Sequence, residues 1–199
     1  MSSLKDHLLS RLLNLDFDGD KQTFTPDQRN ELRLLNLSHV VESKVLQVNY
    51  TSYNICKEHD WLQTDHYSFL MTLSREEVPD HHPFWYCQLL KAFNIEVHFC
   101  PGGVSRSKEM LDILWVRWLG MVPDHKWGFR QGKLPKVGFI PKDGESPLFG
   151  FLDPSLVICG CHLIPAFVDG HSDQLLQRGL SVARPLDATD DWAGYYVNM

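Results

Sequence analysis

The feature that most constrains the fold is the stretch from residue 82 to residue 100, HPFWYCQLLKAFNIEVHFC. Its side chains alternate between two sets: Phe84, Tyr86 and Gln88 against Trp85, Cys87 and Leu89, then Ile95, Val97 and Phe99 against Glu96, His98 and Cys100. Successive side chains of a β-strand point to opposite faces of the sheet, so this period of two predicts two strands or one long bent strand.

Most of the remaining chain also has the pattern of strands. The segments KVLQVNYTSY, YSFLMTL, LDILWVRWLG, KVGFIP, LFGFL and CHLIPAF are short and apolar or alternating, and polar or glycine-containing loops separate them. No regular alternation of strands with long helices is present, so the pattern favours an antiparallel barrel or sandwich. We therefore expect a mainly β (α+β) protein.

Helices are expected only near the N-terminus. Ser2 and Ser3 can cap a first helix whose leucines form one apolar stripe. Thr25 followed by Pro26 is typical of an N-cap and first helical position, which predicts a second helix over 26–35. A single helical turn is expected after Asp153. These patterns divide the chain into an N-terminal helical segment (1–40), a β-barrel domain (41–168) and an irregular C-terminal tail (169–199) that packs on the barrel through its late aromatic residues.

Charge and cysteine content narrow the classes of function. The formal net charge of -6 argues against broad nonspecific binding of phosphate backbones. No apolar run approaches the roughly 20 residues that a transmembrane helix needs. The five cysteines are odd in number and scattered, and no signal peptide is visible, which favours reduced thiols inside a cell.

Metal sites and catalytic centres are poorly supported by the spacing of their candidate residues. Asp16, Asp18 and Asp20 occupy positions 1, 3 and 5 of a calcium loop, but Lys21 stands where glycine is needed, so a solvated turn is favoured. Cys161 and His162 are neighbours and would point to opposite faces of a strand. His81 and His82 precede a proline in a predicted solvated loop. We expect no catalytic residue, no metal and no cofactor.

Aromatic residues near the ends of the predicted strands are the candidates for a ligand pocket. They are Trp85, Tyr86, Trp118, Trp127 and Phe129. Such rings can form a cage that attracts a methylated ammonium group through cation–π interactions. The alternative is that the rings fill the core, which is favoured for Trp115 and Phe84.

A loose run of basic residues supports an alternative function in nucleic-acid binding. The residues are Arg106, Lys108, Lys126, Arg130, Lys133 and Lys136. A local positive potential can attract DNA although the whole chain is acidic.

Several strings along the chain carry a family resemblance. HLLSRLLNLDFDGD, TFTPDQRNELRLLN, VLQVNYTSYN, HPFWYCQLLKAFNIEVHF, LDILWVRWLG, LPKVGFIP, FGFLDPSLVICGCHLIPAF and DDWAGYYVN occur in this order. Together they resemble the C-terminal region of proteins encoded by basidiomycete DNA transposons of the Plavaka type, from about His7 to Asn198. The resemblance implies a fungal, transposon-derived terminal domain without the transposase core. That family commonly has Arg where Cys159 stands.

A more distant likeness concerns the fold. HPFWYCQLLKAF, LWVRWLG, PKVGFIP and DPSLVICGCHLI look like the strand order of a bromo-adjacent homology (BAH) domain, over roughly 44–166. The likeness implies a BAH-like or SH3-like antiparallel β-barrel of the kind found in chromatin modules, with Tyr86, Trp115, Arg117 and Trp118 central.

These observations together predict a noncatalytic module that binds protein or chromatin, with a histone tail as one candidate partner. The alternative is a DNA-binding or assembly domain of a transposase complex. The first function implies the nucleus, with the cytoplasm as the alternative. No membrane partner is expected, and the sequence favours no particular oligomeric state.

Overall fold

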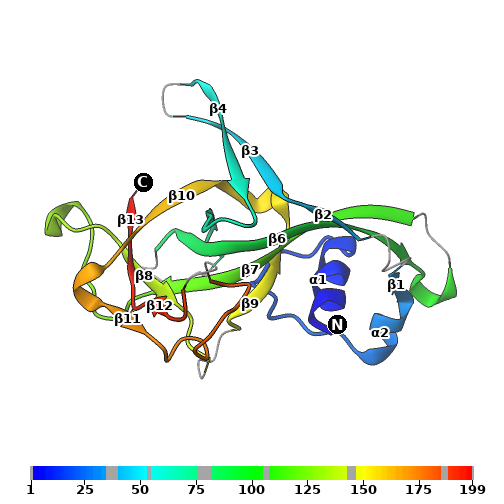
Figure 1. Ribbon diagram of the computed structural model, residues 1–199. Coiled ribbons are helices and arrows are strands. Elements are labelled where there is room, and N and C mark those ends of the chain that lie inside the picture. The colour runs from blue at the N-terminus through cyan, green and yellow to red at the C-terminus, as the bar shows by residue number, and fades with distance from the viewer. Residues whose placement is uncertain are drawn as a thin grey trace.

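A computed structural model describes residues 2–34, 40–52, 55–75, 82–104, 108–142, 147–184 and 188–198. The protein is mainly β, and its centre is a nine-stranded antiparallel sheet (Figure 1). The strands are β1 (Leu32–Leu34), β2 (Val41–Ser43), β3 (Val45–Thr51), β4 (Lys57–Gln63), β5 (Phe69–Leu73), β6 (Phe84–Phe99), β7 (Lys108–Met121), β8 (Lys136–Phe139), β9 (Phe149–Leu152), β10 (Val157–Pro165), β11 (His171–Ser172), β12 (Asp191–Trp192) and β13 (Tyr195–Asn198). The helices are α1 (Ser2–Leu12) and α2 (Pro26–Glu31), with single 3₁₀ turns η2 (Pro101–Gly103), η3 (Phe129–Gln131), η4 (Pro154–Leu156) and η5 (Phe167–Asp169).

Two long strands, β6 and β7, form the spine of the sheet. The alternating stretch from Phe84 to Phe99 is one continuous strand, β6, and a bulge between Leu89 and Lys91 interrupts its pairing with β7. A bulge bends a strand and increases its local twist. The pairing order runs β1-β6-β5-β10-β13-β8-β7-β9, and β6 and β7 also pair with each other.

The two faces of β6 pack into different parts of the core, as the alternation predicts. Cys87 and Leu89 belong to one buried cluster together with Trp118, and Trp85 packs against it. Tyr86 belongs to a second cluster on the other face. A third cluster covers the far half of the spine, where Leu8 and Leu9 of α1 pack against residues of β6 and β7.

The second helix begins as predicted and ends earlier than predicted. Thr25 is its N-cap, Pro26 its first residue, and Thr25 and Gln28 form a reciprocal capping box. The helix was expected to reach residue 35, but it ends at Glu31. The following three residues form β1 and pair with the end of β6, because the backbone hydrogen bonds of a sheet edge replace those of another helical turn.

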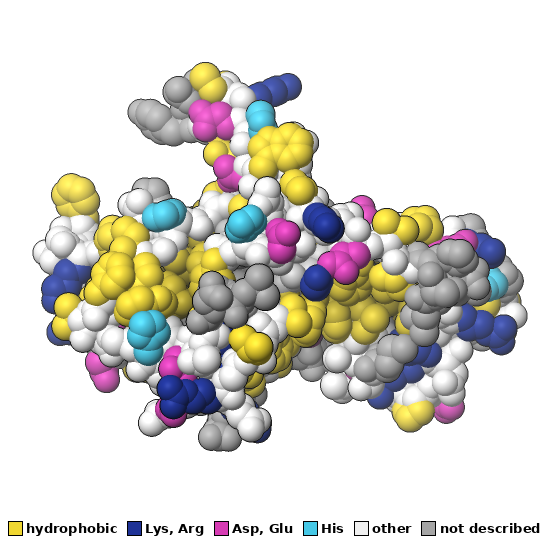
Figure 2. Space-filling view, viewed as in Figure 1, with side chains coloured by type: hydrophobic (Ala, Val, Ile, Leu, Met, Phe, Trp, Pro, Cys, Tyr) yellow, Lys and Arg dark blue, Asp and Glu magenta, His cyan; other side chains and the backbone are white. Residues whose placement is uncertain are grey.

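A β-hairpin made of β3 and β4 projects from the body as a separate two-stranded sheet (Figure 1). Val48 on its inner face joins the core, while Trp61 on its outer face is 62% exposed. Hydrophobic and charged side chains are both visible along this projection in Figure 2. The sequence does not predict β4, because the charged residues of this strand hide the alternation that β3 shows clearly. None of the helices in the described part of the chain has the length and apolarity that crossing a membrane requires.

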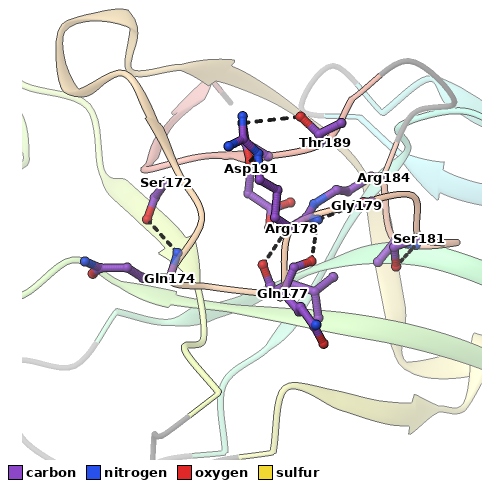
Figure 3. Close-up of polar contacts among 12 residues, drawn as sticks. Ser172, Gln174, Gln177, Arg178, Gly179, Ser181, Arg184, Thr189 and Asp191 are labelled. Atoms are coloured by element: carbon purple, nitrogen blue, oxygen red, sulfur yellow. Dashed lines mark hydrogen bonds and ion pairs between the residues drawn. The ribbon is translucent and has the colours of Figure 1, made fainter.

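The C-terminal segment is held to the sheet by strand pairing and by buried charges. The tail was expected to be irregular, but β13 pairs with both β10 and β8. Asp191 accepts hydrogen bonds from both terminal nitrogens of Arg117, each at 2.9 Å, and one from Nη2 of Arg184 at 2.9 Å. Arg184 also donates to the backbone carbonyls of residues 176, 177 and 179, part of which Figure 3 shows. The C-terminal segment therefore packs on the sheet, and its last strand is part of it.

Candidate functional site

The candidate site is built around two tryptophans from neighbouring strands. Trp85 lies near the start of β6 and Trp118 near the end of β7, and Trp118 stands opposite Cys87 in the register of the two strands. Because Trp85 and Cys87 are two residues apart, both tryptophans lie on the same face. Their ring centroids are 6.2 Å apart with an interplanar angle of 75°, an edge-to-face arrangement. Phe17 contacts both rings, at 6.3 Å and 6.2 Å.

A cavity of about 180 Å³ opens beside these rings. We call it the Trp85–Trp118 cavity. Its apolar wall is formed by Phe84, Trp85, Trp118, Met121, Ile140 and Pro147. A cavity lined mainly by aromatic and aliphatic side chains is typical of a site that receives an apolar group of a ligand.

His82 closes one side of the cavity and connects it to two other predicted site residues. The side chain was expected to be solvated, but it is only 5% exposed. Its ring stacks on Tyr86, whose hydroxyl lies 2.6 Å from Nε2, and it meets the edge of Trp127 at a centroid distance of 4.8 Å. Burial lowers the pKa of His82, so the imidazole is neutral at pH 7. His81 lies outside the described residues.

The structure brings together two of the five predicted pocket residues. Trp85 and Trp118 line the cavity, whereas Tyr86 is 1% exposed and packs in the core of the opposite face. Trp127 contacts His82 but is not among the described residues that line the cavity. Phe129 is fully exposed on a loop. The strand alternation explains the error for Tyr86, because neighbours in a strand cannot share a face.

Charge inside the cavity does not favour a cationic ligand. Lys21 is the one charged residue among the described lining, and it is a cation. The nearby carboxylate of Asp20 is already used: it lies 2.7 Å from Nδ1 of His7 and accepts the backbone N–H of Phe151 at 2.5 Å. Asp20 was expected in a solvated turn, but its side chain is 9% exposed. An uncharged apolar or aromatic side chain therefore suits this cavity better than a methylated ammonium.

A second aromatic cavity, of about 310 Å³, is not predicted by the sequence. It is lined by Tyr67 and Tyr195, by Trp192, and by the histidines at positions 162 and 171. The imidazole of His171 stacks on Trp192 at 3.8 Å. The string DDWAGYYVN contains several of the lining residues, and its cluster of aromatic rings is the one sequence signal for this cavity. The tail shows no strand pattern that would place these rings in the fold.

The six basic residues do not form one patch. Arg106 lies outside the described residues, and Lys108 forms an ion pair with Glu96 at 3.7 Å. Lys108 begins β7, whereas Lys126, Arg130 and Lys133 follow its other end. The strand between them spans about 43 Å at the usual rise of ~3.3 Å per residue.

Lys136 differs from the other basic residues near this end of β7 because its ammonium is already paired. Its Nζ lies 2.5 Å from a carboxylate oxygen of Asp169 and 5.6 Å from the centroid of the Tyr196 ring. Lys136 is therefore part of the packing of the tail.

Thiols and imidazoles are the remaining candidate metal ligands and nucleophiles of the chain. His98 and Cys100 share a face as expected, with Sγ 3.6 Å from Nε2. Cys161 is half-buried and His162 is exposed, which agrees with their opposite faces. Burial raises the pKa of Cys161 to about 12, so its thiol stays protonated at pH 7. Among the described residues, no group of three or more His, Cys, Asp or Glu side chains is placed to hold a metal ion.

Comparison with known proteins gives no family for the chain. No family model matches it, and neither a curated protein nor a solved structure is significantly similar to it.

Proposed function

We propose that the chain is a noncatalytic protein-binding module, and that the Trp85–Trp118 cavity receives an apolar or aromatic side chain of the partner. The observation that carries this proposal is an open, apolar cavity beside two tryptophans that the core already holds in place. Tryptophan is enriched among the residues that dominate binding energy at protein interfaces. A preorganised ring also loses little conformational entropy when a partner binds.

The order of strand pairing supports a BAH-like or SH3-like barrel for the body of the module. Pairing runs from β6 through β5, β10, β13 and β8 to β7, and β7 pairs again with β6. A sheet whose pairing returns to its first strand leaves few exposed edges, which is the property of small antiparallel barrels. This arrangement places the Trp85–Trp118 cavity where β6 begins and β7 ends.

The partner that we propose is a basic peptide segment, with a histone tail as the first candidate, and the site of action is then the nucleus. The net charge of -6 favours encounter with a basic partner. Within that peptide, the group that enters the cavity is an uncharged side chain, because Lys21 is the charged residue of the described lining. The origin that we propose for the module is a fungal transposon-encoded protein, in keeping with the order of its sequence strings.

Isothermal titration with a set of histone-tail peptides tests the proposal. The wild-type protein is expected to bind at least one peptide, and Trp85→Ala is expected to weaken that binding by about 30-fold, as for a typical interface hot spot of about 2 kcal/mol. The matched control is Trp61→Ala, which removes an exposed tryptophan of the projecting hairpin and should leave the affinity unchanged. Absence of binding to every peptide, or equal losses from both variants, would contradict the proposal.

A further inference from the structure

The loop between β7 and β8, residues 122–135, has a charge opposite to that of the whole chain. We call it the Phe129 loop. Residues 125–136, HKWGFRQGKLPK, contain four Lys or Arg and no Asp or Glu, although the chain carries a net charge of -6. The loop projects at the left of Figure 1, and Lys or Arg side chains and a hydrophobic side chain stand at that edge of the molecule in Figure 2. Asp124, immediately before this segment, is the nearest carboxylate in the sequence.

Hydrogen bonds and glycine geometry give the tip of the Phe129 loop a defined shape. Phe129 begins the 3₁₀ turn η3, which lies between Gly128 (φ 102°) and Gly132 (φ 58°), conformations that favour glycine. The N–H of Gly128 donates to the carbonyl of Lys133 at 2.9 Å and closes the tip. At the base of the loop, Trp127 packs against the buried ring of His82. The side chains of the tip therefore project from a turn of defined conformation.

The side chains at this tip are exposed, and its cations are not neutralised by ion pairs within the described part of the chain. Phe129 is fully exposed. Lys126, Arg130 and Lys133 are also exposed, and none of the three forms an ion pair with any residue that the structure describes. Lys136, just beyond the loop, differs because Asp169 neutralises it.

We propose that the Phe129 loop binds single-stranded nucleic acid. A base can stack on the exposed ring of Phe129 while phosphates contact Lys126, Arg130 and Lys133, which is the combination that single-strand binding proteins use. Duplex DNA hides the faces of its bases inside the stack, so a projecting ring gains little there. An acidic peptide offers charge but lacks a base face for stacking. An anionic membrane is disfavoured because the loop exposes two large hydrophobic side chains, those of Phe129 and Leu134, among charged and polar ones.

This surface is distinct from the Trp85–Trp118 cavity. Phe129 and the three cations do not line that cavity among its described residues. Loss of nucleic-acid binding would leave the proposed peptide binding intact, and the reverse also holds.

Fluorescence anisotropy with labelled 20-nucleotide oligo(dT) and oligo(U) at 50 mM salt tests the proposal. Three phosphate contacts predict a slope of about -2 in log affinity against log salt, or roughly 20-fold weaker binding at 200 mM. Lys126→Gln with Lys133→Gln should reduce this slope to about -0.7. Phe129→Ala should weaken binding by about 5-fold or more and leave the slope unchanged.

Matched controls separate the loop from the general charge of the protein. Lys44→Gln with Lys57→Gln makes the same change in charge on the exposed hairpin region, and Val168→Ala shortens an apolar side chain that is 100% exposed. Both should bind as the wild type does. The proposal is overturned by no binding at 50 mM salt, by equal losses from the loop and control pairs, or by equal or tighter binding of a 20-base-pair duplex, a polyglutamate peptide or phosphatidylserine vesicles.

Discussion

Replacement of Asp191 by Asn tests whether buried charges hold the C-terminal tail to the sheet. The carboxylate has no exposed surface and accepts three hydrogen bonds from two guanidinium groups, those of Arg117 and Arg184. Asn keeps the shape but removes the negative charge, so both cations remain buried without a counter-charge. Removal of one partner of a buried ion pair costs about 3–5 kcal/mol. We expect a loss near the upper end of this range, because one carboxylate serves two cations.

Urea unfolding followed by circular dichroism measures this loss directly. A change of about 5 kcal/mol is a large share of the ~5–15 kcal/mol that stabilises a typical domain, so the midpoint of unfolding should fall clearly. The control is Glu96→Gln, which breaks the exposed pair with Lys108 and should cost less than about 1 kcal/mol. If Asp191→Asn and Glu96→Gln destabilise the protein equally, the buried cluster does not have the role assigned to it.

Acidic pH, a glycine substitution and a thiol reagent test the packing at three further places. Burial raises the pKa of Asp191, but hydrogen bonds from the two arginines lower this pKa below its ordinary value overall. The stability that the carboxylate contributes is therefore present above about pH 4 and is lost as the pH falls further. The difference in unfolding free energy between wild type and Asp191→Asn should shrink below that pH. Gly150→Ala should cost about 1–3 kcal/mol in the same unfolding assay, because the new Cβ would lie 2.4 Å from Nε1 of Trp118, whereas Gly120→Ala, with 3.9 Å to its nearest neighbour, should cost much less. Cys87 is fully buried and its thiol pKa is raised by burial, so a thiol reagent should leave it unmodified in the native protein; modification at the rate of an exposed thiol would contradict this packing.

The sequence predicts the central strands well because their side chains follow the physical rule of alternation. Trp85 and Tyr86 are neighbours in the sequence, and the rule correctly places their rings on opposite faces. Local capping chemistry is equally readable, since Thr25 caps α2 and Asp153 caps the turn at Pro154. These features depend on residues a few positions apart, which a single sequence contains.

The features that the sequence does not predict depend on contacts between distant residues. Arg117 appears in an apolar strand as an exception, but its partner Asp191 is 74 residues away. His82 precedes a proline in a polar segment, and only the tertiary fold buries it against Tyr86 and Trp127. Trp85 and Trp118 line the same cavity because of the register in which β6 pairs with β7. The alternation of side chains within each strand does not determine that register.

The indole N–H signals of the tryptophans give the most direct test of the central claim, that the Trp85–Trp118 cavity binds the partner. During titration with a bound histone-tail peptide, two-dimensional ¹H–¹⁵N spectra should show shifts for Trp85 and Trp118. The signal of Trp61, on the outer face of the hairpin, should stay in place. Shifts at Trp61 without shifts at Trp85 and Trp118 would show that the partner binds elsewhere and would contradict the account.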